Sequence, residues 1–361
     1  MKSLLLCGII LISFATFSQT DQEKKDAIKI AQKAIKLMDD GEIKKSIKML
    51  KEAIKLDGTN FNFPYEIGLA YYKLENYKKS IEYLTETLSY DDITDQCYTM
   101  LGNAYDMNGD PDRAIEIYDD GLKVFPRSGR LYYEKGVVER SRDNLDVALG
   151  YWTKGIFVRP TYASNYYMAA HIYCSNTEEE IWGMLYGEIM MNIERTTGRT
   201  NELSKLLYDT YNSAISISGD EASVSFSQEM SMSLPGEGEE MKLPFQMHYE
   251  MTTSLSVAAV MNGGDLSIAD INQMRTTFIE TWFEQETHKQ YPNFLFNFHK
   301  KLMDLGYFEC YNYWVLMKGN ESEFESWVAE HDSEFEEFIK WFKDHPLAID
   351  DKNSFHHSQY D

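Results

Sequence analysis

The chain has 361 residues, of which 43% are hydrophobic and 14% aromatic, enough apolar material for one large core or two modest ones. Its 58 acidic residues outnumber its 35 basic residues and give a formal net charge of −23. Nucleic acids and anionic lipids bind to basic surfaces, so this charge argues against both as general partners.

The first 19 residues have the layout of a secretory signal peptide. Lys2 precedes an apolar run over 4–14, and small or polar residues follow before the first charged segment. The run is too short to span a bilayer comfortably, and no later segment has the uninterrupted apolar length of a membrane span. A lipoprotein leader acylated on Cys7 fits less well, because two leucines precede this cysteine where small residues are expected. The sequence therefore predicts a signal peptide over 1–19 and an exported chain of the periplasm, the cell envelope or the extracellular space.

A period of 34 residues begins after the leader. Glycine recurs at this step as Gly68, Gly102 and Gly136. Two further columns keep the same step: Leu50, Leu84, Tyr118 and Trp152, and Ala53, Thr87, Gly121 and Gly155. A fixed period of this length is typical of solenoids built from helix–turn–helix units.

The segment "CYTMLGNAYDMNGDPDRAIEIYDDGLKVFPRS" (97–128) resembles the tetratricopeptide repeat. The family pattern has Leu-Gly and Tyr in the first helix, small and aromatic residues in the second, and Pro at the end. Here Gly102, Ala114 and Gly121 are small enough for paired helices to approach closely. Pro126 cannot continue a helix and ends the unit.

The period places four repeats over 27–60, 61–94, 95–128 and 129–162. A degenerate fifth unit fits 163–193. In its second helix Trp182 stands in place of an expected small residue. We therefore expect this helix to close the stack of repeats rather than to extend it.

The period is lost after the repeats. The sequence predicts a capping helix over 194–217 and an extended linker or flap over 218–242, in which apolar residues occupy alternate positions, as in a strand. Helical periodicity returns over 243–345, and a flexible tail is expected over 346–361. The predicted fold class is all-α: a tetratricopeptide-type superhelix followed by a helical C-terminal domain, with a short strand-like flap between them.

The resemblance implies a concave groove lined by the first helix of each repeat. Arg130 and Arg140 stand out there in an acidic chain, and a guanidinium is suited to hold a peptide carboxylate through paired hydrogen bonds. The alternative is a solvated helix face without a partner. The candidate groove residues are Asn62, Tyr65, Tyr72, Gln96, Asn103, Asp106, Arg130, Tyr133, Arg140, Tyr167 and His171.

No residue pattern indicates catalysis, a cofactor or a metal site. The eight histidines are scattered, and the sequence contains neither a glycine-rich phosphate loop nor GxSxG. Cys97, Cys174 and Cys310 are widely spaced, so we expect buried free thiols more than a disulfide, although one pair stays open.

The sequence therefore predicts a non-enzymatic scaffold that binds a protein or peptide segment in the groove, with no cofactor, no metal, no nucleic acid and no membrane span. Two alternatives stand beside it. Aromatic residues on a rigid groove would also suit an envelope protein that captures a small molecule or glycan. An enzyme, the weaker alternative, would have its site in the helices of 243–345. The identity of the partner and the oligomeric state stay open.

Overall fold

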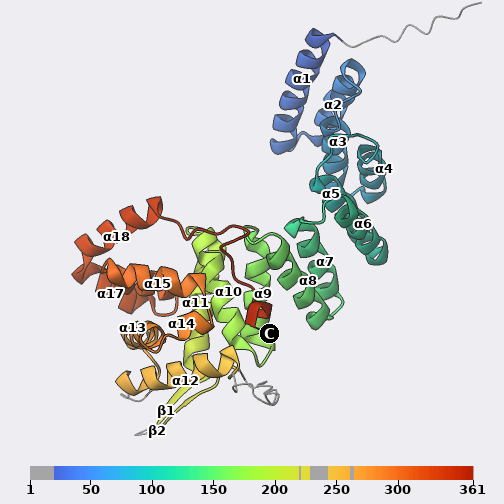
Figure 1. Cartoon of the computed structure of the whole chain (residues 1–361). Coiled ribbons are helices and arrows are strands. Elements are labelled where there is room, and N and C mark those ends of the chain that lie inside the picture. The colour runs from blue at the N-terminus through green and yellow to red at the C-terminus, as the bar shows by residue number, and fades with distance from the viewer. Residues whose placement is uncertain (1–19, 219–220, 228–242, 261–263, 361) are drawn as a thin grey trace, which may run out of the picture. The chain divides into compact units, whose positions relative to one another are not determined.

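The computed structural model describes residues 20–218, 221–227, 243–260 and 264–360, which are mostly helical (Figure 1). The predicted signal peptide lies outside this described part. The described strands are two, of four residues each, and form a single hairpin. The predicted all-α fold class is thus confirmed. The chain divides into two compact units, with the boundary between Ile117 and Tyr118.

Unit 1 is a series of helices joined by short turns. Helices α1 and α2 pack against each other as a hairpin, as do α3 and α4, and α2 and α4 each contact the helix that follows. The helices of this unit are α1 (Asp21–Asp39), α2 (Ile43–Leu56), α3 (Asn62–Lys73), α4 (Tyr77–Thr87), α5 (Asp95–Met107) and the first part of α6 (Pro111–Val124).

The turn inside each hairpin carries a residue in the left-handed conformation, again at a step of 34 residues. These residues are Gly41, Glu75, Gly109 and Asp143, with φ angles of 83°, 57°, 86° and 64°. Glycine adopts this conformation without steric cost, whereas the two acidic residues have a Cβ that opposes it. The repeat period is therefore present in the backbone even where the side chains differ.

The small and bulky columns of the sequence period touch each other inside the hairpins. A Cβ added to Gly68 would lie 2.6 Å from Leu84, and one added to Gly136 would lie 2.3 Å from the Trp152 indole. Both distances are far below the optimal separation of two carbon atoms. Glycine is therefore required at these positions because the bulky residue of the second helix fills the space.

Unit 2 begins with the rest of α6 and continues through two further helix pairs. These are α7 (Gly129–Ser141) with α8 (Leu145–Val158), and α9 (Ala163–Asn176) with α10 (Glu180–Ile193). Helix α11 (Gly198–Ala214) follows, within the predicted capping segment 194–217.

The predicted flap is short in the part that the structure describes. Strands β1 (Ile215–Ser218) and β2 (Glu221–Val224) pair antiparallel, and the predicted region 228–242 lies outside the described residues. Phe226, just after β2, is fully buried. The backbone N–H groups of Phe226 and Ser227 donate to the Glu250 carboxylate at 2.8 and 2.7 Å, which fixes the end of the hairpin on the helix that follows.

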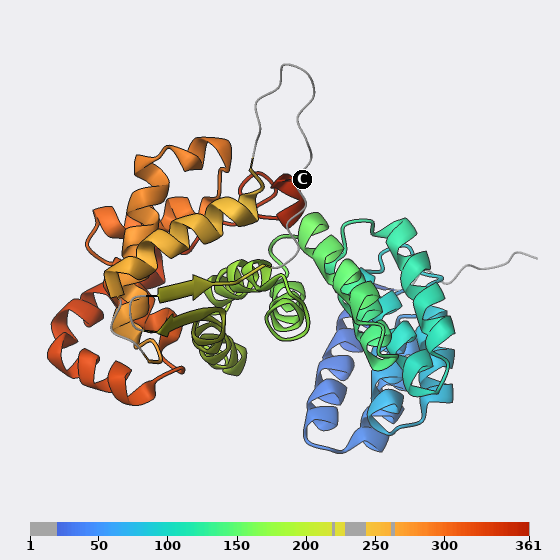
Figure 2. The same cartoon turned by 90° about the horizontal axis from the view of Figure 1, so that it is seen from below.

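The helices of the predicted C-terminal domain over 243–345 share one hydrophobic core with the last repeat helices. Every residue of α10 from Ile181 to Asn192 is buried. Trp182, expected to close the stack, lies parallel to Phe245 of the next block, with ring centroids 5.4 Å apart. Figure 2 shows the orange C-terminal helices beside the yellow-green α10 and α11. These helices are α12 (Phe245–Val257), α13 (Ile268–Glu284), α14 (Thr287–Gln290), α15 (Phe294–Asp304), α16 (Phe308–Leu316), α17 (Glu321–Glu330) and α18 (Asp332–Asp344), with a 3-10 turn η1 (Ala258–Val260).

Residues 346–360, predicted as part of a flexible tail, contact the core of unit 2. Leu347 and Phe355 are buried, and a 3-10 turn η2 (His357–Tyr360) ends the described chain. The Tyr360 ring lies on Phe245 with centroids 4.3 Å apart. The polar composition of this segment suggested fraying, but its few aromatic side chains find a place in the core of unit 2.

Candidate functional site

Arg130 and Tyr133, two of the predicted groove residues, lie on α7 beside Tyr162, the N-cap residue of α9. The Arg130 guanidinium carbon is 5.9 Å from the centroid of the Tyr162 ring. The rings of Tyr133 and Tyr162 meet edge to face, with centroids 6.2 Å apart. Arg140 lies two turns after Tyr133 on the same helix and is exposed. We call Arg130, Tyr133, Arg140 and Tyr162 the α7 surface; the sequence prediction had not included Tyr162.

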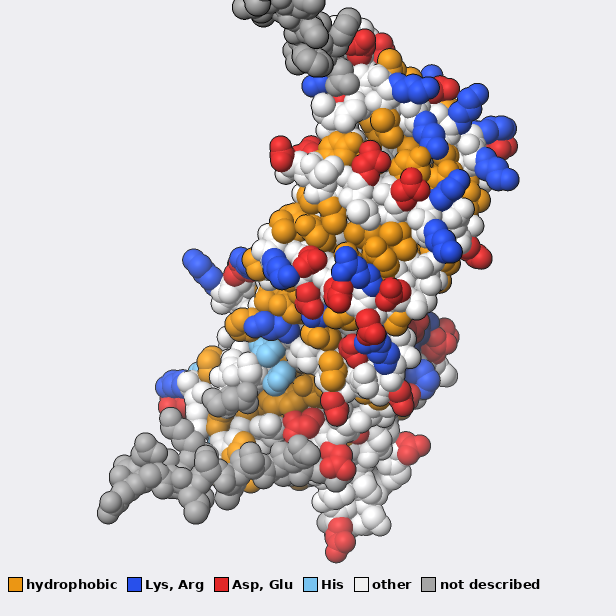
Figure 3. All heavy atoms as spheres, turned by 90° about the vertical axis from the view of Figure 1, so that its right-hand side faces the viewer, with side chains coloured by type: hydrophobic (Ala, Val, Ile, Leu, Met, Phe, Trp, Pro, Cys, Tyr) orange, Lys and Arg blue, Asp and Glu red, His pale blue; other side chains and the backbone are white. Residues whose placement is uncertain are grey.

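The two arginines of the α7 surface have no carboxylate partner in the part of the chain that the structure describes. Among the residues that the structure describes, neither Arg130 nor Arg140 forms an ion pair, whereas Arg142 pairs with Glu139 at 3.1 Å. Burial raises the pKa of Tyr162, and the charge of Arg130 partly opposes this rise. Positive charge is thus available beside aromatic rings. On the face shown in Figure 3, hydrophobic side chains lie among both acidic and basic ones.

Tyr167 and His171, predicted to line the groove, lie half-buried on α9, and α11 packs against this helix. The Tyr167 hydroxyl donates to the Glu202 carboxylate of α11, and the Arg199 guanidinium lies 5.3 Å from the Tyr167 ring centroid. Burial, with the nearby Glu202 charge, raises the pKa of Tyr167 to about 12. The Tyr167 side chain thus has its partners, Glu202 and Arg199, on the helix that follows the last repeat.

The other predicted groove residues belong to unit 1 and lie on or at the start of its first helices. Asn62 begins α3, and its N–H donates to Asn60 at 3.0 Å. The rings of Tyr72 and Tyr77 meet edge to face at 5.4 Å. Tyr65, Asn103 and Asp106 are half-buried, and Gln96 is exposed. This set is polar and aromatic and contains no basic residue, unlike the α7 surface.

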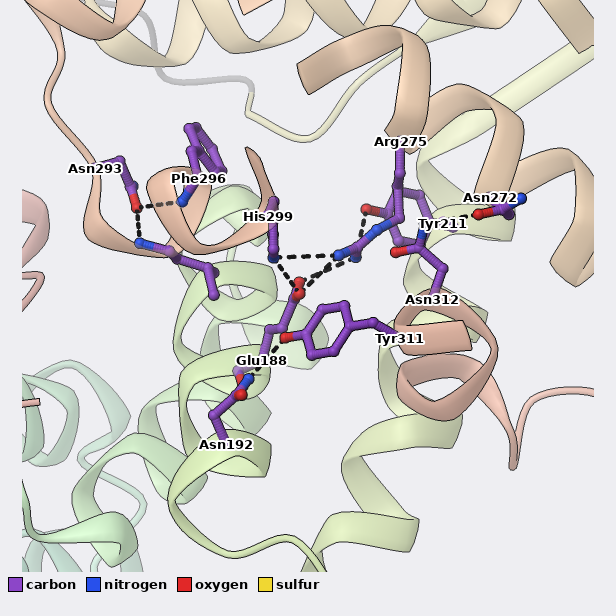
Figure 4. A network of polar contacts seen from close by, with 11 residues as sticks. Glu188, Asn192, Tyr211, Asn272, Arg275, Asn293, Phe296, His299, Tyr311 and Asn312 are labelled. Atoms are coloured by element: carbon purple, nitrogen blue, oxygen red, sulfur yellow. Dashed lines mark hydrogen bonds and ion pairs between the residues drawn. The ribbon is translucent and has the colours of Figure 1, made fainter. Parts of the chain in front are cut away.

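A buried charged cluster, absent from the sequence prediction, lies between α10 and the C-terminal helices (Figure 4). Glu188 of α10, Arg275 of α13 and His299 of α15 are only 5%, 7% and 4% exposed. The two terminal nitrogens of Arg275 donate to the two Glu188 oxygens at 2.6 and 3.0 Å. His299 Nε2 lies 2.6 Å from Glu188 Oε1. One carboxylate is therefore held by two neighbours from separate helices.

Tyrosine hydroxyls surround this cluster. Arg275 lies 3.4 Å from the Tyr211 hydroxyl, and Asn192 donates to the Tyr311 hydroxyl at 2.7 Å. Burial alone would raise the pKa of Glu188, but Arg275 and His299 outweigh it and hold that pKa well below its ordinary value. Burial lowers the pKa of His299, so its contact with Glu188 is a hydrogen bond of the neutral ring. A lone glutamate within the apolar stretch "IWGMLYGEIMMNI" was the signal that could have revealed the cluster.

A small cavity adjoins the cluster and is lined mainly by apolar side chains. Its volume of about 30 Å³ leaves room for about one water molecule. Arg275, whose Nε has no hydrogen-bond partner among the described residues, contributes to its wall. A space of this size does not admit a substrate, so it adds no support to the alternative of an enzyme site in 243–345.

The free energy of unfolding is expected to fall as the pH is lowered from 7 to 5. The pKa of His299 in the folded chain lies below its ordinary 6.5, so the unfolded chain takes up a proton that the folded chain resists. Glu188, with its lowered pKa, adds to the loss below its ordinary 4.5. Each proton bound only by the unfolded chain costs about 1.4 kcal/mol per pH unit.

Urea unfolding at pH 7, 6 and 5 measures how steeply the free energy of unfolding depends on pH. We expect a shallower slope of free energy against pH for His299→Gln. Equal slopes for the variant and the wild type would contradict this assignment.

Other kinds of site find little support in the part of the chain that the structure describes. No three His, Cys, Asp or Glu side chains there are arranged to hold a metal ion. None of the described helices has both the length and the apolar character needed to cross a bilayer. Cys97, Cys174 and Cys310 are free thiols, and burial raises the pKa of Cys310 to about 11.

Several known proteins are similar to this chain. BBSome complex member BBS4 from Bos taurus is 29% identical over 120 residues, which cover 31% of this chain and 22% of that protein. The mouse protein of the same name is 28% identical over 127 residues. The chain thus spans less than a quarter of the length of these relatives. Among solved structures, PilF from Pseudomonas aeruginosa covers 53% of this chain and 86% of its own, with 13% identity and a TM-score of 0.44. MamA from Desulfovibrio magneticus RS-1 covers 50% of this chain and 99% of its own, with 15% identity and a TM-score of 0.38.

Two family models, both described as tetratricopeptide repeat, match residues 65–93 and 99–155. The matched regions hold the glycine and bulky columns that meet inside the hairpins α3–α4 and α7–α8. Sequence, local geometry and family comparison therefore agree on the same stretch. Residues 65–93 and 99–155 therefore match the tetratricopeptide repeat, in agreement with the resemblance seen in the sequence.

Proposed function

We propose that the chain is an exported interaction scaffold that captures a peptide segment of another protein on the α7 surface. The observation that supports this most is the pair of arginines, Arg130 and Arg140, which form no ion pair among the described residues although the chain is strongly acidic. A guanidinium without a carboxylate partner, placed beside tyrosine rings, suits a peptide that carries an acidic side chain.

The family comparison supports the general role of a scaffold. Tetratricopeptide repeats present the first helix of each pair to a partner, and the α7 surface lies on such a helix. The curated relatives are named as members of a protein complex, which agrees with a role in assembly. The α7 surface is part of unit 2, where α7, α8 and α9 pack on one another, so its residues are held on a rigid support.

The proposed site of action is the periplasm, the cell envelope or the extracellular space. This rests on the first 19 residues, in which a lysine precedes an apolar run and a small-residue region. Expression of the full chain in its own host, followed by N-terminal sequencing of the mature protein, tests it. A mature N-terminus close to Thr20 in the exported fraction is expected, and an uncleaved cytoplasmic chain would rule it out.

Reversal of the two arginine charges is expected to weaken peptide capture at least about tenfold, because a charge-assisted hydrogen bond contributes about 1.5–3 kcal/mol. Peptides are first selected from a random library on the wild-type chain. The enriched peptides are then titrated against Arg130→Glu/Arg140→Glu, with the fold checked by circular dichroism.

A matched control carries the same change of charge away from the α7 surface. Arg113→Glu/Lys123→Glu alters two exposed residues of α6 that pair with carboxylates on their own helix. We expect this variant to bind like the wild type. If the enriched peptides bind both double variants equally well, the α7 surface is not the capture site.

A further inference from the structure

The last described residues of the chain sit in an aromatic pocket of unit 2. Phe355 is 1% exposed, and its ring lies 5.5 Å from Tyr186 and 6.1 Å from Trp182, centroid to centroid. The Tyr360 ring stacks on Phe245 at 4.3 Å and meets a second ring, Tyr291, edge to face at 5.5 Å. We call the four residues that receive these rings the tail pocket: Trp182, Tyr186, Phe245 and Tyr291.

Directed hydrogen bonds hold the same segment. His357 Nδ1 lies 2.8 Å from the Tyr186 hydroxyl, and the backbone N–H of His357 donates to the same hydroxyl at 3.1 Å. The hydroxyl therefore donates to Nδ1 of a neutral imidazole, and burial of His357 lowers its pKa in agreement with this state. The Tyr360 hydroxyl and the Gln359 amide both donate to the Pro292 carbonyl, at 3.0 and 3.1 Å. Apolar anchors and a small set of placed polar groups are what a peptide site uses to fix its ligand.

The stretch that leads to this segment is weakly attached. Between Leu347 and Phe355 no residue is buried, and none belongs to a helix or strand. The ion pair of this stretch joins two exposed side chains, Arg127 and Asp351, and such pairs add little stability. Ile349 is the half-buried apolar residue of this stretch that contacts the core, so Phe355–Tyr360 docks mainly through its own side chains.

We propose that the tail pocket is a peptide-binding site and that residues 355–360 are its intramolecular ligand. The ligand class is a short segment with the pattern Phe-x-His-x-x-Tyr, in which the Phe ring is buried, the Tyr ring is half-buried and stacked, and the histidine is neutral. A partner protein that carries such a segment binds by displacing the tail. This site uses none of the α7 surface residues, so it stands or falls independently of the function proposed above.

The test uses the full chain and a fluorescent peptide of residues 353–360, followed by anisotropy. In Phe355→Ala/Tyr360→Ala the tail loses both anchors, and the free pocket is expected to bind the peptide saturably. In the wild type the tethered tail competes at an effective concentration of about millimolar, so binding is expected to be at least about tenfold weaker. A peptide with alanine at both aromatic positions is expected not to bind either chain.

Lys352→Ala serves as the control, because Lys352 is exposed and lies outside the segment 355–360; we expect it to behave like the wild type. A folded double variant that fails to bind the peptide, or one that binds it no better than the wild type, overturns the proposal. If the double variant does not fold, the proposal is tested by the same peptide titration with the single variant Tyr360→Ala. Tighter binding than to the wild type then supports the tail pocket, and unchanged binding overturns it.

Discussion

Arg275→Met is expected to lower the free energy of unfolding by about 3–5 kcal/mol, because it leaves the Glu188 carboxylate buried without its main partner. Methionine fills a similar volume, so the loss of stability measures the effect of the unpaired charge and not the effect of a cavity. His299 makes one hydrogen bond to Glu188 Oε1 and so replaces only part of what the two Arg275 nitrogens donate. Urea unfolding followed by circular dichroism measures the change.

Two controls separate the unpaired charge from other causes. Arg113→Met removes an exposed arginine from a surface pair, and its effect is expected to stay within about 0.5 kcal/mol. The triple variant Glu188→Leu/Arg275→Met/His299→Phe removes every polar member of the cluster at once. We expect it to be more stable than Arg275→Met, because no buried charge is left unpaired. A triple variant less stable than the single one would show that the cluster stabilises the fold beyond the neutralisation of Glu188.

The repeat half of the fold could be predicted because its determinants are local. Each 34-residue unit contains both helices of a hairpin and the glycine and bulky residue that meet between them, as in Gly68 with Leu84. Such contacts recur at one spacing, so a periodic sequence reveals them without knowledge of the rest of the chain. The positions of Arg130 and Tyr133 on one helix followed from the same register.

The buried cluster could not be predicted because its members are distant in sequence. Glu188 is 87 residues from Arg275 and 111 residues from His299. No period or motif relates these positions. Taken singly, each is an ordinary charged or polar residue that does not indicate a buried cluster. Only the packing of the C-terminal helices on α10 brings them together.

The tail shows a different limit of sequence reasoning. The segment "NSFHHSQYD" is polar overall and too short for a periodic signal, so composition favoured disorder. Its attachment depends on two rings, Phe355 and Tyr360, and on acceptors supplied by Tyr186 and Pro292. Contacts of this kind depend on the shape of a distant pocket, which a single sequence does not display.

Gly136→Ala is expected to destabilise unit 2 by about 2–3 kcal/mol, because the added methyl group overlaps the Trp152 indole at 2.3 Å. Trp152 is fully buried, and its Nε1 donates to the Tyr133 carbonyl at 3.1 Å. The ring therefore cannot move aside without the loss of this hydrogen bond, and Tyr133 belongs to the α7 surface.

Gly150→Ala is the matched control, because nothing lies within 4 Å of its added Cβ and the site is exposed in the middle of α8. There alanine is expected to stabilise the helix by up to about 1 kcal/mol. Thermal unfolding of the two variants decides the point: if Gly136→Ala is as stable as Gly150→Ala, helices α7 and α8 do not approach as closely as the repeat pattern requires.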